Sequence, residues 1–219
     1  MHVGSRDKAN CFQINLQHSR TGTSNLGQLV SQHNVDISYV QEPYTINNKL
    51  AGIPRSHKVY TSGDGMKKTA IVINNDQLDA TPITQLSNED RVAVDVRSEA
   101  VIFFGVSKYF DSRRNIEEDI RQLEKLMNYT KGYGLIIAVV SNARSKMWHD
   151  TITNQRGKIL KEFLICNDLC VLNEFTETPT FESNSGGSRT DPTTTNSRLV
   201  CYVSDWICGQ EKAAQTATL

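Results

Sequence analysis

An uninterrupted apolar run, Leu135–Val140 (LIIAVV), constrains the fold of this chain more than any other feature. A strand with no polar residue on either face must be covered on both faces, which is typical of a sheet inside an α/β domain. The start of the chain supplies the opening of such a domain. Cys11–Gln17 and Ile37–Val40 have strand patterns, and Thr21–Asn34 between them has the apolar spacing of a helix.

The middle of the chain adds strands of another kind. Thr69–Ile73, Val92–Val96 and Val101–Tyr109 are rich in β-branched residues and are separated by turns, so we expect an antiparallel run. Two more helices are expected over Asn115–Tyr129 and Arg156–Asn167, where apolar residues follow the helical period. This mixture predicts an α/β fold, namely a four-layer sandwich of two packed mixed β-sheets flanked by helices.

The domain limits follow from length and pattern. A chain of 219 residues suits one α/β domain. We place it at residues 11–211, after a flexible N-terminus (residues 1–10) and before a divergent, truncated C-terminal tail (residues 212–219). Within it, Pro192 interrupts the threonine-rich segment Asp191–Thr195. Because proline cannot donate a ladder hydrogen bond, this segment is expected to be an edge strand or a damaged one.

Charge and hydropathy exclude several classes of protein. Lys+Arg and Asp+Glu each number 24, so contact with nucleic acid would need a local basic patch such as Lys67, Lys68, Arg113 and Arg114. The start has no apolar signal-peptide core, and no apolar run is long enough to span a membrane. We therefore expect an intracellular monomer, nuclear or cytoplasmic, with no membrane contact and no small-molecule cofactor.

The five cysteines do not form a recognisable metal site. They include no CxxC pair, and no histidine pair accompanies Cys166 and Cys170, which are one helical turn apart. Buried free thiols in a reducing compartment are the favoured interpretation.

Polar side chains at the ends of buried strands are the candidates for chemistry, since the scaffold fixes them and the strand end exposes them. Asn15, Glu42, Tyr109 and Asn142 occupy such positions. A carboxylate and amides at one sheet edge suit a Mg²⁺ ion with a phosphate ligand, because Mg²⁺ takes one or two carboxylates and keeps several waters. Each residue alone has an ordinary structural explanation, but their common position predicts a site.

A series of short motifs, in this order, resembles a known family. The motifs are Ile14-Asn15-Leu16-Gln17, Tyr39–Tyr44 (YVQEPY), Val106–Phe110 (VSKYF), Ser141–Ser145 (SNARS) with Trp148 and His149, Arg156-Gly157, Asn167-Asp168-Leu169, Pro179-Thr180-Phe181, Asp191 and Trp206. They resemble the apurinic-endonuclease-like domain of insect non-LTR retrotransposons, in the endonuclease/exonuclease/phosphatase superfamily. The resemblance covers the chain from about Cys11 to Glu211.

The resemblance implies a role for each candidate residue. Glu42 would bind Mg²⁺, and Asn15 would support the metal and the phosphate. Tyr109 would hydrogen-bond the scissile phosphate, Asn142 would help to hold it, and Asp191 would orient a catalytic histidine. The implied reaction is in-line attack of water on a DNA phosphodiester, with Mg²⁺ stabilising the developing charge. The nick would leave a 3′ hydroxyl that primes reverse transcription.

Two acid/base positions implied by the resemblance are missing. Val140 stands where the family has the aspartate of an Asp-x-Asn pair, and Gln215 and Thr216 stand where an Asp-His pair is expected. The family's final strand is expected to be lost as well. Because each general acid or base contributes about 10²–10⁴ in rate, we expect an impaired or inactive, decaying copy of the endonuclease.

Alternatives from other classes stay open. One is a nucleic-acid-binding module, or an inert relic, that kept the fold without chemistry. Another is a phosphatase of the same superfamily that acts on an inositol phosphate or a nucleotide. His149 beside Trp148 suggests a replacement base, although a packing role in its loop is the expected one. Asp150 could in principle restore metal binding, but nothing in the spacing requires it.

Overall fold

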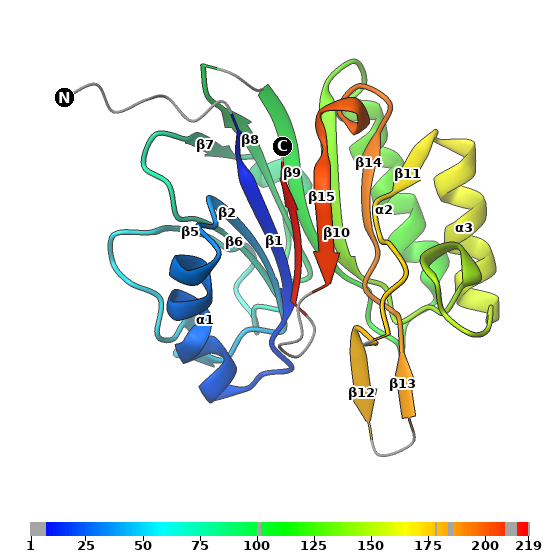
Figure 1. Ribbon diagram of the computed structural model, residues 1–219, viewed down its shortest axis with the longest axis horizontal. Helices are drawn as coiled ribbons and strands as arrows, with labels where there is room; N and C mark the ends of the chain where they lie inside the picture. Colours follow the sequence, from blue (N-terminus) through cyan, green and yellow to red (C-terminus); the bar gives the residue numbers. More distant parts are fainter. Residues whose placement is uncertain (1–7, 100–101, 178, 184–185, 209–213, 219) are drawn as a thin grey trace.

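Two six-stranded sheets lie face to face, with α1 on the outer side of one and α2 and α3 on the outer side of the other (Figure 1). The computed structural model describes residues 8–99, 102–177, 179–183, 186–208 and 214–218. The expected α/β sandwich of two mixed sheets flanked by helices is confirmed.

The first sheet has the strand order β15-β16-β1-β2-β6-β5. β1 and β2 are parallel, and the other neighbours are antiparallel. Its strands are β1 (Asn10–Asn15), β2 (Ile37–Gln41), β5 (Lys58–Tyr60), β6 (Thr69–Ile73), β15 (Ser204–Cys208) and β16 (Ala214–Thr218). The connection from β1 to β2 is α1 (Arg20–Gln32), which begins where the hydroxyl of Ser19 accepts a hydrogen bond from the Gly22 amide at 3.0 Å.

The second sheet has the strand order β11-β14-β10-β9-β8-β7, in which only β9 and β10 are parallel neighbours. Its strands are β7 (Asp79–Pro82), β8 (Arg91–Arg97), β9 (Ile102–Tyr109), β10 (Gly134–Val140), β11 (Leu169–Val171) and β14 (Thr193–Asn196). Its helices are α2 (Ile116–Tyr129) and α3 (Gln155–Cys166), which begin after the N-cap residues Asn115 and Asn154.

Short elements complete the fold. Two hairpins stand apart from the main sheets, one formed by β3 (Thr45–Ile46) and β4 (Lys49–Leu50), the other by β12 (Phe181–Ser183) and β13 (Gly186–Ser188). Single 3₁₀ turns cover Thr84–Leu86, Lys146–Trp148 and Val200–Tyr202.

Three apolar clusters fill the three interfaces between the four layers. Phe12 and Leu26 belong to the cluster between the first sheet and α1. Tyr39 and Phe103 belong to the cluster between the two sheets. Trp148 belongs to the third cluster, under α2 and α3. The continuous apolar run of β10 is therefore explained, because its alternate residues face two different cores.

Two expectations about strands are wrong. Thr69–Ile73 forms a strand with the expected bounds, but it pairs with β2 and β5 in the first sheet rather than with β8 and β9. The segment after Pro192 is neither damaged nor at an edge, since β14 lies between β11 and β10. Pro192 stands just before this strand, where its missing N–H costs no ladder bond, and its carbonyl accepts from the Val139 amide at 3.1 Å.

The expected loss of the final strand is also wrong. Ala214–Thr218 forms β16, which pairs antiparallel with β1 in the first sheet, so the segment taken as a divergent tail contributes to the core architecture. Thr216 lies opposite Phe12 in this pairing, three residues before Asn15. Thr216 is therefore not at the end of β1 where Asn15 lies, and residues 209–213 lie outside the described residues.

The cysteines differ from expectation in their exposure. Cys11 is buried, whereas Cys166, Cys170 and Cys201 are exposed, and all four are free thiols. Over the part of the chain that the structure describes, no helix has both the length and the apolar character needed to cross a membrane.

Candidate active site

The candidate residues lie where five strands start or end at one end of the sandwich. Asn15 ends β1, Glu42 follows β2, and Tyr109 ends β9. Asn142 comes two residues after β10, and Asp191 comes two residues before β14. Because β1 and β2 are parallel neighbours, as are β9 and β10, their carboxyl ends meet at the same edges of the two facing sheets.

Two of these residues have a left-handed backbone, with φ of +46° at Glu42 and +48° at Asn142. This conformation costs a non-glycine residue about 1–2 kcal/mol, and it is kept by bonds around it. The Glu42 amide donates to the Lys68 carbonyl at 2.8 Å, and the Glu42 carbonyl accepts from the His18 amide at 2.7 Å. The sharp turn ends the strand and leaves the carboxylate of Glu42 partly exposed at its end.

The Tyr109 hydroxyl lies near the side chains of Glu42 and Asn142, both of which influence its pKa. Burial, and then the negative charge of Glu42, raise the pKa of Tyr109 to about 12, and the bond from Asn142 offsets part of that rise. The hydroxyl therefore stays protonated at neutral pH and can donate a hydrogen bond. The Asn142 amide is oriented by its own bond to the Phe110 carbonyl at 2.8 Å.

Asp191 is buried behind this group. Burial raises the pKa of its carboxyl to about 7, hydrogen bonds from Thr190 and Thr180 partly offset the rise, and the charge of Glu42 adds to it. The bond from the Thr190 hydroxyl is 3.1 Å long. The shared influence of Glu42 on Tyr109 and Asp191 places these three groups in one electrostatic neighbourhood.

Asn15 joins the site through the backbone. It stands in register with Gln41, the residue before Glu42, and its amide oxygen accepts from the Gln17 amide at 3.0 Å. The structure thus places Glu42 and Asn142 near Tyr109, with Asn15 and Asp191 beside them. The role of each residue stays a prediction.

Val140 occupies the position of the expected aspartate. It is buried, ends β10 and stands in register with Tyr109. Asp150 does not replace it, because the carboxylate accepts from Arg144 Nε at 2.9 Å and from the Arg189 amide at 2.8 Å. His149 is turned away into its loop, as expected, with Nε2 3.0 Å from the Asn173 carbonyl oxygen.

The basic patch expected from the sequence is divided by ion pairs. Lys68 and Arg113 both contact Asp111, at 2.8 Å and 2.9 Å, and Arg114 contacts Asp90 at 2.7 Å. Lys67 is buried and donates to a backbone carbonyl. Of this set, Lys68 lies at the site, with its ammonium 5.5 Å from the centre of the Tyr109 ring.

His18 is a neighbour of the site that the sequence analysis did not include. Its Nε2 lies 3.6 Å from Glu42 Oε1, and its Nδ1 lies 3.3 Å from the Pro43 carbonyl oxygen. His18 could have been included from the sequence, because it follows Asn15 by three residues. The chain must turn sharply there, between β1 and α1, and so keeps His18 near the end of β1.

Polar residues that sequence reasoning missed lie between the sheets below the site. We call Gln13, Gln41, Ser107 and Thr193 the intersheet polar cluster. Gln13 accepts from the Thr193 hydroxyl at 2.6 Å and donates to the Val139 carbonyl at 3.2 Å. Gln41 donates to the Ser107 hydroxyl at 2.9 Å. The four members lie one or two residues from Asn15, Glu42, Tyr109 and Asp191, so the cluster fixes the offset of the two sheets directly under the site.

Gly157 fixes the loop that carries Asn142. A Cβ built on this residue of α3 would come within 1.9 Å of the Arg144 carbonyl oxygen. Only glycine permits this approach of helix to loop.

The donor groups fit a hard divalent cation. Within the described ranges, no three His, Cys, Asp or Glu residues gather as a metal cluster. The Glu42 carboxylate is 19% exposed, and the Asn15 amide oxygen lies on the neighbouring strand. One carboxylate with water is a common arrangement for Mg²⁺, which retains most of its hydration.

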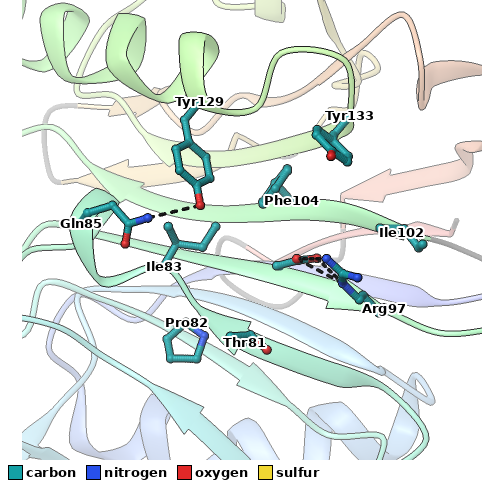
Figure 2. A pocket seen from close by; sticks show the side chains of 10 residues that line it. Thr81, Pro82, Ile83, Gln85, Arg97, Ile102, Phe104, Tyr129 and Tyr133 are labelled. Atoms are coloured by element: carbon teal, nitrogen blue, oxygen red, sulfur yellow. Dashed lines mark hydrogen bonds and ion pairs between the residues drawn. The ribbon is translucent and has the colours of Figure 1, made fainter.

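A hollow of about 400 Å³ lies at the other end of β9 from Tyr109 (Figure 2). Its walls include Phe104 and Ile102 of β9, Tyr129 at the end of α2, and Tyr133. The Tyr129 hydroxyl accepts a hydrogen bond from the Gln85 side chain at 3.2 Å across this hollow.

Comparison with known proteins relates the chain to mobile-element nucleases. The family described as endonuclease-reverse transcriptase matches residues 103–213, which are 111 of the 219 residues. A 115 kDa protein of the type-1 retrotransposable element R1DM from Drosophila melanogaster is 24% identical over 193 residues, covering 84% of this chain and 19% of that protein. The chain thus spans about a fifth of the length of this relative.

Solved structures that are similar over almost the whole chain include the following two. The endonuclease domain of TRAS1, a telomere-specific non-LTR retrotransposon, has a TM-score of 0.89 and 27% identity, and the match covers 97% of this chain and 98% of that one. The AP endonuclease LMAP from Leishmania major has a TM-score of 0.74 and 13% identity over 97% of this chain and 87% of that one, and shares the fold alone.

Proposed function

Because the chain belongs to the endonuclease-reverse transcriptase family, we propose that its site nicks DNA phosphodiester bonds with Mg²⁺, to provide a primer end for reverse transcription. The resemblance to non-LTR retrotransposon endonuclease domains seen in the sequence is confirmed by the TRAS1 domain, and the fold of two mixed sheets agrees with it. DNA as the partner, a monomeric state and action in the nucleus belong to the proposal. The observation that carries it is the meeting of Glu42, Tyr109 and Asn142 at the carboxyl ends of neighbouring strands of the two facing sheets.

The side chains at the site have distinct tasks in this reaction. The protonated Tyr109 hydroxyl donates to a non-bridging oxygen of the scissile phosphate, and the Asn142 amide holds a second oxygen. These donors are fixed before the substrate arrives, so stabilising the charge that develops on the phosphate requires little reorganisation. Lys68, beside the Tyr109 ring, adds positive charge at the same place.

Glu42 and Asn15 would hold the Mg²⁺ ion. When bound, this ion supplies Lewis-acid stabilisation of the phosphate and its leaving oxygen. Glu42 is prepared for this task by its left-handed backbone, which points the carboxylate out of the end of the strand. Asp191, buried behind it, is the expected orienting group for a histidine.

The cleavage step in this copy is expected to be slow. Val140 is buried beside Tyr109, and its side chain has no lone pair with which to orient or deprotonate the attacking water. A general base contributes about 10²–10⁴ in rate, so the chain should retain phosphate binding but only a small part of the turnover of an intact site.

The test is nicking of supercoiled plasmid in Mg²⁺, with EDTA as a blank. We expect a slow, Mg²⁺-dependent conversion to open circles that Glu42→Ala abolishes. The matched control is Glu124→Ala, which removes an exposed carboxylate on α2 and should leave the rate unchanged. Product that persists in Glu42→Ala would overturn the proposed site, and fast turnover by the unmodified chain would overturn the impairment.

A second candidate function is DNA binding without cleavage. This function is favoured by the buried valine at position 140, which stands where an acid is expected. Without that acid, the site still keeps the groups that face the phosphate. If the chain binds DNA through phosphates, affinity must fall steeply as salt rises, and a gel shift at several salt concentrations measures this. Binding with no product even at high enzyme concentration would favour this function over nicking.

A further inference from the structure

Phe175 is the most exposed of the large hydrophobic residues whose side chains the structure describes, with 69% of its surface open to solvent. Single exposed hydrophobic residues are common and need no special explanation. Phe175 differs from such residues because its ring is held by two neighbouring side chains that are themselves anchored.

The first neighbour is Arg189. Its guanidinium carbon lies 5.3 Å from the centre of the Phe175 ring, within the range of a cation–π contact. The guanidinium also donates to the Thr176 carbonyl, and the Arg189 amide donates to Asp150 at 2.8 Å. Both ends of this residue are therefore fixed, and its positive charge stays beside the ring.

The second neighbour is His149. Its ring meets that of Phe175 edge to face, with centroids 6.2 Å apart and an angle of 78° between the planes. The bond between Nε2 and the Asn173 carbonyl, together with the left-handed backbone of His149, sets the position of the imidazole. The Phe175 ring is thus held by two side chains while most of its surface remains open.

This supported ring lies next to the candidate active site. Asn173, two residues before Phe175, donates to the Asp191 carbonyl at 3.2 Å and accepts from the Thr193 amide at 2.8 Å. On the other side, the Trp148 indole N–H contacts the carbonyls of Ala143 and Arg189, which links Arg189 to the loop that begins at Asn142. Phe175 and Arg189 are therefore tied to the segments that carry Asp191 and Asn142.

An open aromatic ring beside a fixed guanidinium matches the chemistry of a nucleotide. The ring offers a flat apolar face to a base, and the guanidinium offers a positive charge to the adjoining phosphate. We propose that Phe175 and Arg189 form a stacking platform for one unpaired base of the DNA next to the bond that is cut. This inference rests on the proposed function, since it specifies which form of DNA the site takes.

The base must be unpaired for a geometric reason. Inside a duplex both faces of a base are covered by its neighbours, so an aromatic ring can stack on it only after it leaves the stack or where the helix already ends. Stacking on an aromatic side chain contributes about 5- to 150-fold in affinity for each base. The platform therefore selects DNA that is open, mismatched or easily unstacked near the cut.

The experiment measures binding in EDTA, where no cleavage occurs, by fluorescence anisotropy at moderate salt. Two probes are compared, a fully paired duplex and the same duplex with a short unpaired bubble that carries 2-aminopurine. We expect Phe175→Leu to weaken bubble binding by about 5- to 150-fold, to lower the quenching of 2-aminopurine, and to leave duplex binding within about twofold. Phe175→Trp, which keeps an aromatic face, should retain both signals.

The matched control is Tyr202→Leu, at an aromatic residue of similar exposure (66%) that follows β14 and lies beyond the end of that strand farther from Asp191. It should leave both probes unaffected. The platform would be overturned if a folded Phe175→Leu protein lost affinity equally for both probes, or lost affinity for neither. In that case plasmid nicking could still support the proposed function. Absence of binding to any DNA would overturn both. Self-association of the chain that Phe175→Leu removes would assign the ring to a protein contact instead and overturn the platform.

Discussion

At one end of the sandwich the strands terminate in polar side chains, and at the other end β7, β8 and β9 of the second sheet line the hollow of Figure 2. β9 runs through both ends, from Ile102 and Phe104 at the hollow to Tyr109 at the candidate site. At the hollow, Phe104 contacts the rings of Tyr129 and Tyr133 edge to face, with centroids 5.9 and 5.4 Å apart. These contacts are ordinary packing, with side chains in favourable surroundings.

At the candidate-site end, several residues adopt backbone conformations or environments that are locally unfavourable. Glu42 and Asn142 have left-handed backbones, and burial raises the pKa of Tyr109 and of Asp191. Features that cost free energy and cluster in one place are typical of functional sites. The comparison teaches that changes at the site end should alter rate and pH dependence, whereas changes at the hollow should alter stability alone.

The largest effect is expected from restoring an acid at the end of β10. Val140→Asp should raise the plasmid-nicking rate by about 10²–10⁴, because a carboxylate beside Tyr109 can orient and deprotonate water. The control is Val140→Asn, because asparagine has nearly the shape of aspartate but cannot act as a base. This variant should not raise the nicking rate. If both variants fold and nick at the rate of the unmodified chain, the missing acid at the end of β10 does not limit the reaction.

The next effect concerns the proton on Asp191. Folding raises its pKa from the usual 3.8 to about 7, so the folded state binds this proton more tightly than the unfolded chain. The resulting stabilisation is complete at acidic pH and is lost as pH rises through about 7. Asp191→Asn, which has no such proton, should flatten the pH dependence of the free energy of unfolding by about 3 kcal/mol between pH 5 and pH 8.

Urea unfolding in EDTA at the two pH values measures this difference. Other titrating groups cancel when the variant is compared with the unmodified chain. Identical pH profiles for the two proteins would show that Asp191 is not a strained member of the site.

A smaller effect is expected from the intersheet polar cluster. Thr193→Val removes the donor to Gln13 and leaves a buried amide oxygen without that partner, which costs about 1–3 kcal/mol. The paired variant Gln13→Leu with Thr193→Val should recover part of the stability, because neither polar group remains. Chemical denaturation measures both. A recovery of nicking that lags behind the recovery of stability would show that the cluster also positions the site.

The smallest effect is expected at the hollow. Tyr133→Ala removes one edge-to-face contact with Phe104 and should lower the free energy of unfolding by about 0.5–1.5 kcal/mol. The nicking rate measured well below the melting temperature should not change. A clear change in the nicking rate of this variant would contradict the expectation that changes at the hollow alter stability alone.

Local pattern predicted most elements of the fold, because their signals are contained in short segments. The α2 helix begins one residue after the start expected from its apolar stripe, and β6 has the expected bounds. The sheet to which β6 belongs was mistaken, since pairing depends on distant residues and not on the strand itself. Thr216 was misplaced for the same reason, because its register against Phe12 is set by the whole first sheet.

The candidate site was predictable only in part. Asn15, Glu42, Tyr109 and Asn142 could be found because polar residues at strand ends stand out from apolar runs. The intersheet polar cluster could not, since Gln13 and Gln41 have the alternation of solvent-facing residues although they face the opposite sheet. The support of Phe175 by His149 and Arg189 likewise depends on three segments that meet only in the folded chain.

Gly157 and Val140 differ in what a substitution would change. At Gly157 it would change the packing of the fold, and at Val140 it would change the reaction. Val140 is buried at the end of β10, so exchange of an acid for valine at this position would not disturb the packing. Adding even a methyl group to Gly157 would force α3 away from the Arg144 carbonyl and shift the loop behind Asn142. A copy released from selection for cleavage can therefore lose its reaction long before it loses its shape.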